Sequence, residues 1–306
     1  MSGIRCVRRF WMVVLWSLVL GGSATPPTQL RLPVRPANAL TGTQLRDALT
    51  SLSREEREAF LYEELVKGNV PEFLRTLFVV KHSATVAGHL HTIVFVVSPD
   101  YLAFGSDADF FRMPMTPGGA QRICDYLDCS LPTRKLVDII WENSEWKLTP
   151  QPIPPSPEMV SVDTFYAHHT MIEKQRSELG VPLGHLLSGI KKDVVITPQL
   201  FVPRDKPRVA IYGWHYPKGT PIQPLSLVHE ASYVDYSHGI RLIANDVVVD
   251  GTPMRLQDVL SHPQLWALVS DEGAFVSGCR YPTPSVPTKS ATSNSSTTRE
   301  REYLNW

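Results

Sequence analysis

The sequence has 306 residues and a mass of 34.3 kDa, of which 43% are hydrophobic and 20% charged. This composition supports a buried core and excludes disorder as the main state of the chain. Thirty basic residues balance thirty acidic ones, so the net charge predicts no attraction to nucleic acid or to an anionic surface. The 18 glycines follow no three-residue period and no longer repeat is present, which excludes collagen and repeat architectures.

The first 24 residues have the pattern of a secretory signal peptide. Three arginines precede the apolar run 10–20, which is followed by small residues with a cleavage position after Ala24. The apolar run has about half the length that a membrane-spanning helix needs, so a cleaved signal is favoured over a retained anchor. We therefore expect a secreted or periplasmic protein without a membrane span, whose mature chain carries 27 basic and 30 acidic side chains.

Composition divides the rest of the chain into three parts. Residues 25–41 are rich in proline and predict a spacer, whereas residues 281–306 are mostly Ser, Thr, Pro, Asn and Lys at first and predict a disordered tail. The body between them, residues 42–280, has the size of a single domain. It holds Cys124, Cys129 and Cys279, which are too few for a disulfide framework and are read mainly as small buried hydrophobes, with one bridge left open.

The first half of the body predicts helices around a small group of strands. Helix signals cover an acidic cluster from Glu55 to a stop at Gly68, and a short helix from Pro71 to Leu77. Apolar runs separated by turn residues predict strands over 92–97, 101–104 and 110–113. Two further helices follow from apolar spacings of three and four, over 120–127 and 136–141 after Pro132.

The second half predicts one long helix and then mainly strands. After the proline-rich run 151–157, the helix begins behind Ser161 and stops at Gly180. Strands are expected over 193–197, 208–213, 233–237, 240–244 and 247–249, with a hairpin turn at Asp250-Gly251 and a last helix over 263–269. Because successive strands lack intervening helices, the fold class is α+β, with a mainly antiparallel C-terminal sheet in one compact domain.

Polar residues concentrate on the predicted late strands, most of all in the segment 233–241. No glycine-rich phosphate loop, HExxH, paired CxxC or G-x-S-x-G motif is present. A hydrolase could use these residues for general acid–base and nucleophilic chemistry. The roles are a base at His238 or His229, an orienting Asp235, a nucleophilic Ser237, and charge stabilisation by Arg241 or Lys192. The alternative is a structural ion pair between Asp235 and Arg241 beside a half-buried His238.

Aromatic residues in the same region indicate a substrate-binding surface or, alternatively, a capped core. The residues considered for substrate binding are Trp214, His215, Tyr233 and Tyr236. A platform of Trp214, Tyr216, Tyr233 and Tyr236 would instead suit a non-catalytic carbohydrate- or peptide-binding module.

Other histidines and cysteines give weaker signals. His215, His229, Asp235 and His238 have the chemistry of zinc ligands, but their spacing matches no zinc motif, so no cofactor is favoured. The adjacent His168 and His169 cannot both face one site from a helix, so at least one is expected to face solvent. His89 and His91 are read as surface residues. Cys129 precedes a helix as a thiolate nucleophile would, although a buried cysteine is the simpler reading.

Five segments together resemble a family of uncharacterised exported bacterial proteins. The segments are YLAFGSDAD (101–109), LPTRKLVD (131–138), KKDVV (191–195), IYGWH (211–215) and DYSHG (235–239). The resemblance covers about residues 50 to 270 and supports the division into segments, but it implies no reaction.

From these observations we expect a secreted hydrolase that acts on an extracellular or cell-envelope polymer, either a peptide or a glycan. The competing hypotheses are the extracellular binding module and a purely structural role for the polar cluster.

Overall fold

The computed structural model describes residues 25–281, so the expected signal peptide and nearly all of the expected tail lie outside the described residues. Seven α-helices and three short 3-10 helices are present in the described part. The α-helices are α1 (Gly42–Leu49), α2 (Arg54–Val66), α3 (Glu72–Arg75), α4 (Pro117–Leu127), α5 (Arg134–Asn143), α6 (Val162–Glu178) and α7 (Leu256–Ser261). The 3-10 helices are η1 (Pro157–Val160), η2 (Pro198–Phe201) and η3 (Leu265–Leu268).

The strands form two larger sheets and two small pairs. The first sheet contains β1 (Phe78–Val86), β2 (His89–Val97), β5 (Cys129–Ser130), β12 (Ile243–Ala244), β13 (Asp246–Val249) and β14 (Thr252–Arg255). The second has the order β10 (Pro221–Ser226), β9 (Ile211–His215), β8 (Lys192–Val194) and β11 (His238–Gly239). The pairs are β3 (Ala103–Ser106) with β4 (Asp109–Arg112), and β6 (Trp146–Lys147) with β7 (Leu187–Ser188).

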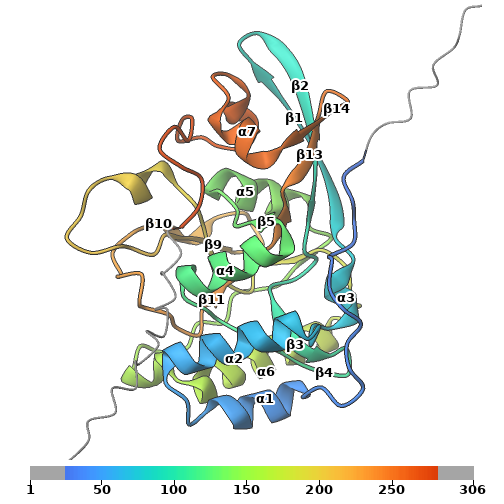
Figure 1. Ribbon diagram of the computed structural model, residues 1–306, viewed down its shortest axis with the longest axis vertical. Helices are drawn as coiled ribbons and strands as arrows, with labels where there is room; N and C mark the ends of the chain where they lie inside the picture. Colours follow the sequence, from blue (N-terminus) through green and yellow to red (C-terminus); the bar gives the residue numbers. More distant parts are fainter. Residues whose placement is uncertain (1–24, 282–306) are drawn as a thin grey trace, which may run out of the picture.

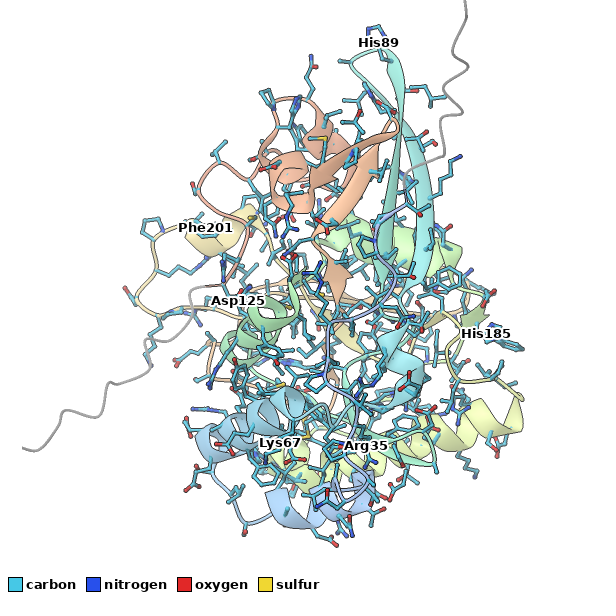
Figure 2. All side chains as sticks on the ribbon, turned by 45° about the vertical axis from the view of Figure 1, so that its right-hand side comes forward. Arg35, Lys67, His89, Asp125, His185 and Phe201 are labelled. Atoms are coloured by element: carbon cyan, nitrogen blue, oxygen red, sulfur yellow. The ribbon has the colours of Figure 1, made fainter. Side chains whose placement is uncertain are left out.

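The predicted α+β class is confirmed, and most strand pairs are antiparallel. Only the β8–β11 and β6–β7 pairs within residues 25–281 are parallel. Helices α1, α2 and α6 lie together at one end of the molecule, and the long β1–β2 hairpin projects at the other (Figure 1). His89 lies at the tip of this hairpin (Figure 2). His91, in contrast, hydrogen-bonds Asp250 at 2.6 Å, so this surface histidine does have a carboxylate partner.

Local sequence signals explain the best-predicted elements. Helix α6 begins where the Ser161 side chain accepts a hydrogen bond from the Thr164 amide, and it ends before Gly180, which has a φ of +66°. The hairpin between β13 and β14 turns at Asp250 (φ +50°) and Gly251 (φ +82°), as the Asp-Gly pair predicts.

Several predicted elements differ in the structure. Residues 233–237 form turns rather than a strand, and the last helix is replaced by α7, which begins earlier, and the short η3. Strands β1 and β10 were absent from the sequence-based prediction. Each of them is defined by its pairing with a neighbouring strand more than by its local pattern.

The proline-rich segment 25–41 lies against the domain instead of standing free as a spacer. Gln29 forms an antiparallel bridge with Thr76, and the Leu30 amide donates to the Arg75 carbonyl at 2.9 Å. Tyr281, expected as the first residue of the tail, is 3% exposed and donates its hydroxyl to the Val195 carbonyl. The folded unit therefore extends beyond both predicted boundaries.

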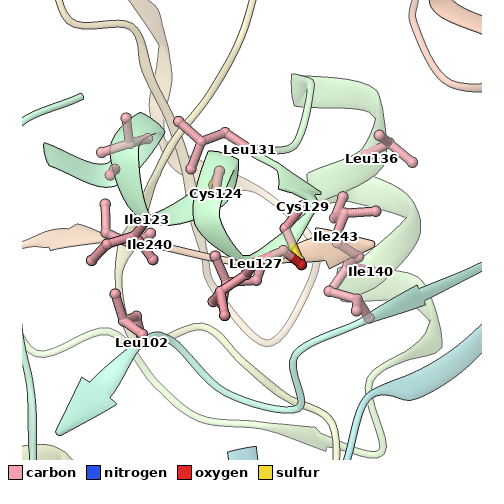
Figure 3. Close-up of a cluster of buried hydrophobic side chains, with 14 of the residues drawn as sticks. Leu102, Ile123, Cys124, Leu127, Cys129, Leu131, Leu136, Ile140, Ile240 and Ile243 are labelled. Carbon is pink, nitrogen blue, oxygen red and sulfur yellow. The ribbon is translucent and has the colours of Figure 1, made fainter. Parts of the chain in front are cut away.

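The core between α4, α5 and the first sheet is apolar and closely packed (Figure 3). Ile123 and Leu127 of α4, Leu136 and Ile140 of α5 and Ile243 of β12 belong to one buried hydrophobic cluster, and none of these side chains is more than 5% exposed. Cys124 and Cys129 are buried in the same region as free thiols, and Cys279 is free as well. The bridge left open by the sequence is not formed. No helix of the described residues is long and apolar enough to cross a membrane.

Candidate functional site

The sequence-predicted site residues lie on or next to the second sheet, but the structure divides them between two places. His238 and Lys192 are paired in register on the parallel strands β11 and β8. His215 is the last residue of β9. Strand β8 lies between β9 and β11, so His215 and His238 are on strands that flank β8. The site residues therefore form two separate polar clusters.

The first cluster surrounds the turn 233–238. The Asp235 carboxylate accepts hydrogen bonds from the Ser237 amide at 2.8 Å, the Ser237 hydroxyl at 2.6 Å and the Tyr233 hydroxyl at 2.9 Å. An aspartate that binds the backbone two residues ahead stabilises a turn, which explains why the predicted strand is absent. The alternation of sides that a strand would impose is therefore wrong for this segment.

The imidazole of His238 belongs to this cluster but makes no hydrogen bond within the described chain. It is 1% exposed, and neither ring nitrogen has a partner. Burial lowers its pKa to about 4, so the ring is neutral near pH 7. Because the Ser237 hydroxyl donates to Asp235, the structure contains no Ser237–His238 hydrogen bond that could activate a nucleophile.

The other predicted members lie around His238 without bonding to it. Tyr233 approaches the ring edge-on, with centroids 5.9 Å apart, and the exposed His229 stacks on Tyr233 at 4.1 Å. The half-buried Lys192 places its ammonium 5.7 Å from the Trp214 ring centroid. The structure thus gathers these residues but gives them no hydrogen-bonded catalytic arrangement.

Arg241 points away from this cluster, and the suggested ion pair with Asp235 is wrong. Its Nη1 donates to the Ser98 carbonyl at 3.0 Å and its Nη2 to the Leu187 carbonyl at 2.8 Å. The guanidinium carbon lies 4.1 Å from the centroid of Tyr101.

The expected aromatic platform is also divided. Trp214 is 3% exposed and Tyr236 is 2% exposed, and the Tyr236 hydroxyl bonds the backbone of Ile153. Only Tyr216 and, in part, Tyr233 reach the surface. The four rings therefore do not form one ligand-binding surface.

The second cluster is built on His215 and Asp138. Nε2 of His215 lies 2.9 Å from Asp138 Oδ1, and the Tyr212 hydroxyl donates to the same oxygen at 2.9 Å. In a regular strand, residues three apart point to opposite faces. Gly213 (φ +99°) and Trp214 (φ +56°) interrupt β9 between them, which turns His215 to the side of Tyr212.

The conformation of Trp214 identifies this stretch as strained. A residue with a side chain pays about 1–2 kcal/mol in the left-handed region, and such strain concentrates at functional sites. Here the strained residue immediately precedes the histidine that it positions.

A small polar pocket lies beside His215, below α5. Val137, Ile140 and Trp141 of α5 form one wall, and Trp141 stacks on the His215 ring with centroids 5.6 Å apart. The volume of about 10 Å³ suits a single water molecule. The polar lining residues are Tyr101, Ser188, Lys191, Asp193, His215 and Arg241.

Asp193 is the buried carboxyl group of this pocket. It is 4% exposed, and its Oδ2 accepts a hydrogen bond from the Tyr101 hydroxyl at 2.8 Å. Burial raises its pKa to about 6, against the effect of the nearby Arg241 charge. A methyl group at Gly213 would lie 3.5 Å from both Asp193 Oδ2 and His215 Cε1, so the carboxyl and the imidazole border the same gap.

The sequence predicted His215, Trp214 and Arg241 as site residues and placed Lys191 and Asp193 in the same polar region without a role. It gave no signal for Asp138, Trp141 and Tyr101. Asp138 and Trp141 lie on a helix whose apolar spacing marks it as a core element. No local motif connects Asp138 with His215, which is 77 positions away.

Buried Lys191 connects this pocket to α6. It is 1% exposed, and its Nζ lies 3.0 Å from His168 Nδ1 and also donates to the Tyr236 carbonyl. Next to His168, His169 lies with its Nδ1 3.3 Å from Arg112. Both histidines are buried, at 0% and 6% exposure, so the expectation that one faces solvent is wrong. Burial lowers both pKa values, to about 2 for His168, which keeps the rings neutral beside these cations.

In the unmodified protein the free energy of unfolding is expected to rise with pH above about 7 because of Lys191, and Lys191→Met is expected to remove this rise. Burial lowers the folded-state pKa of Lys191 from 10.5 to about 7. Between these values the unfolded chain binds a proton that the folded chain lacks, so the free energy of unfolding rises by at most about 1.4 kcal/mol per pH unit. Urea denaturation at pH 7, 8 and 9 measures the slope. The exposed Lys174→Met is the control; an unchanged slope in Lys191→Met would contradict the buried state.

The remaining nucleophile and metal candidates find little support. Burial raises the pKa of Cys129 to about 12, so its thiol stays protonated at neutral pH. Among residues 25–281 no group of three or more His, Cys, Asp or Glu side chains is arranged to hold a metal ion.

Comparison with known proteins gives no match. No family model, no curated protein and no solved structure is similar to this chain.

Proposed function

We propose that the protein is a hydrolase that acts on an extracellular or cell-envelope polymer, with His215 as the general base. The observation that carries the proposal is the hydrogen bond between His215 Nε2 and Asp138, because His215 also lines a pocket that holds the buried carboxyl of Asp193. Acid–base catalysis typically uses a base and an acid whose different environments separate their pKa values. His215 and Asp193 lie in different environments beside the same small pocket.

Asp138 sets the protonation state of the imidazole. Its carboxylate accepts a hydrogen bond from Nε2–H of His215. Nδ1 of His215 is then the nitrogen that can accept a proton from water. The Asp138 side chain is 39% exposed whereas that of His215 is 5% exposed, so a substrate approaches this pair from the Asp138 side.

Asp193 supplies the acid. Because its pKa is raised to about 6, a substantial fraction of the carboxyl group is protonated in mildly acidic medium and can donate to a leaving group. We therefore expect hydrolysis to decline as the pH rises above about 6. The arginine-rich, apolar leader of the sequence supports an extracellular substrate.

His215→Ala is expected to lower turnover by about 10²-fold or more, because it removes the general base. Asp138→Asn is expected to lower turnover as well, since the neutral amide no longer stabilises a protonated imidazole and its NH2 group can donate to Nε2, which favours the wrong tautomer of His215. Release of dye from labelled casein and from labelled peptidoglycan measures the reaction.

The matched control is His229→Ala, because His229 is exposed and only stacks on Tyr233. Equal activity of His215→Ala and the unmodified protein would refute His215 as the base. Binding of either polymer without any turnover by the unmodified protein would favour the binding-module hypothesis instead.

A further inference from the structure

The guanidinium of Arg241 carries a buried hydrogen-bond donor that is not used. The side chain is 1% exposed, and its two Nη atoms donate to the Ser98 and Leu187 carbonyls. Within residues 25–281 its Nε–H has no partner. Buried N–H groups without partners are rare, because the desolvation of the donor is then not compensated by a hydrogen bond. Arg241 lines the pocket of His215, so a substrate that enters and widens this small pocket would meet the buried donor.

The surroundings of Arg241 hold the guanidinium in place. The two carbonyl acceptors fix its plane, and the Tyr101 ring lies against it at 4.1 Å. The hydroxyl of the same tyrosine donates to Asp193. The positive charge and the free N–H are therefore positioned before a substrate enters, which is the property that stabilises a developing negative charge.

We propose that the bond cleaved in this pocket is an acyl bond, an amide or an ester, and that Arg241 Nε–H binds the oxyanion of its tetrahedral intermediate. This inference rests on the proposed hydrolase function and selects a peptide or ester substrate over a glycan.

Acyl compounds and glycosides differ in the sign of the charge that develops during hydrolysis. Acyl hydrolysis passes through a negatively charged carbonyl oxygen, which a buried guanidinium stabilises. Glycoside hydrolysis passes through a positively charged oxocarbenium-like state, which the same guanidinium would oppose.

The reaction balances with water as the only co-substrate. His215 Nδ1 takes a proton from water as the water oxygen bonds to the carbonyl carbon, and the carbonyl oxygen becomes the oxyanion beside Arg241. The bond from carbon to the leaving nitrogen or oxygen then breaks, and the leaving group takes the proton of the Asp193 carboxyl. The proton on His215 returns to Asp193, which restores the starting state.

The test compares Arg241→Lys with the unmodified protein on simple chromogenic probes. The acyl probes are p-nitrophenyl acetate and an N-acetylated dipeptide p-nitroanilide, and the glycan probe is p-nitrophenyl N-acetyl-β-glucosaminide. We expect the unmodified protein to cleave an acyl probe and to leave the glycoside intact. Arg241→Lys should lower kcat by about 10²- to 10³-fold with little change in KM, since the donor acts only on the oxyanion.

Arg75→Lys is the matched control. Arg75 is also buried, at 6% exposure, and it also donates to backbone carbonyls, those of Val70, Pro33 and Gly68. It does not line the pocket, so its replacement should leave kcat unchanged. If Arg241→Lys fails to fold, inhibition of the unmodified protein by a phosphonamidate dipeptide, a tetrahedral anion, replaces it; stronger inhibition than by the matching amide is expected.

The outcomes separate this inference from the proposed function. Glycoside cleavage that depends on His215 would overturn the acyl assignment while the hydrolase function stands. Acyl cleavage with kcat unchanged in Arg241→Lys, or no preference for the phosphonamidate, would overturn the role of Arg241. Failure to cleave the chromogenic probes and both labelled polymers would overturn the hydrolase function itself.

Discussion

Replacing Arg112 by methionine is expected to lower the free energy of unfolding by roughly 3–5 kcal/mol, because it leaves the buried carboxylate of Asp100 without its cation. Arg112 is 1% exposed and donates to Asp100 through Nε at 2.9 Å and Nη2 at 2.6 Å. Its Nη1 donates to Glu173 at 2.6 Å. Asp100 is itself only 3% exposed, so water cannot replace the lost guanidinium.

Urea denaturation followed by circular dichroism measures this loss, with Arg134→Met as the matched control. Arg134 pairs with Asp271 at 2.8 Å, but the two side chains are 33% and 43% exposed, and such pairs contribute about 1 kcal/mol or less. A loss for Arg112→Met no greater than that for Arg134→Met would show that the buried network does not stabilise the fold.

Gly189→Ala is expected to destabilise the protein by roughly 3 kcal/mol or more, from two separate costs. Gly189 has a φ of +88°, where an L-residue with a Cβ pays about 1–2 kcal/mol. The added Cβ would also lie 2.2 Å from the Leu148 carbonyl oxygen and 3.2 Å from that of His215. These oxygens belong to the backbone and cannot rotate away, and overpacking of this kind typically costs a further 1–3 kcal/mol or so.

Gly184→Ala separates the two costs. Gly184 has a similar φ of +83°, but nothing lies within 4 Å of an added Cβ. We expect this variant to lose only the conformational part, about 1–2 kcal/mol. Thermal unfolding of both variants gives the difference; equal losses would mean that the backbone near Leu148 moves to accept the methyl group.

The parts of the fold predicted correctly are those that local chemistry determines. Helix α6 has a serine cap and a glycine stop, and the β13–β14 hairpin has an Asp-Gly turn, so both follow from a few adjacent residues. In 233–237, by contrast, the alternation typical of a strand is overridden by hydrogen bonds from Ser237 and Tyr233 to Asp235. A side chain that bonds its own backbone competes with sheet formation, and periodicity alone does not reveal it.

The partners of the buried polar groups could not be predicted, because they come from distant parts of the chain. His168 and His169 are both buried because each ring lies against a buried cation, Lys191 or Arg112, contributed by another element. In the same way, His215 was recognised as chemically useful, yet its carboxylate Asp138 belongs to a helix in the first half of the chain. The late strands supply residues to both clusters, and the tertiary fold decides which of them share a pocket.

The left-handed conformation of Trp214 limits how far the stability of this protein can be increased without changing the pocket. Glycine at that position would relax the backbone and would also free the segment that holds the imidazole of His215 toward Asp138. Selection for thermal resistance alone would therefore tend to disrupt the pocket, whereas selection for the proposed hydrolysis would have to keep a locally unfavourable backbone. At position 214, stability and the geometry of the proposed site therefore place opposite demands on one residue.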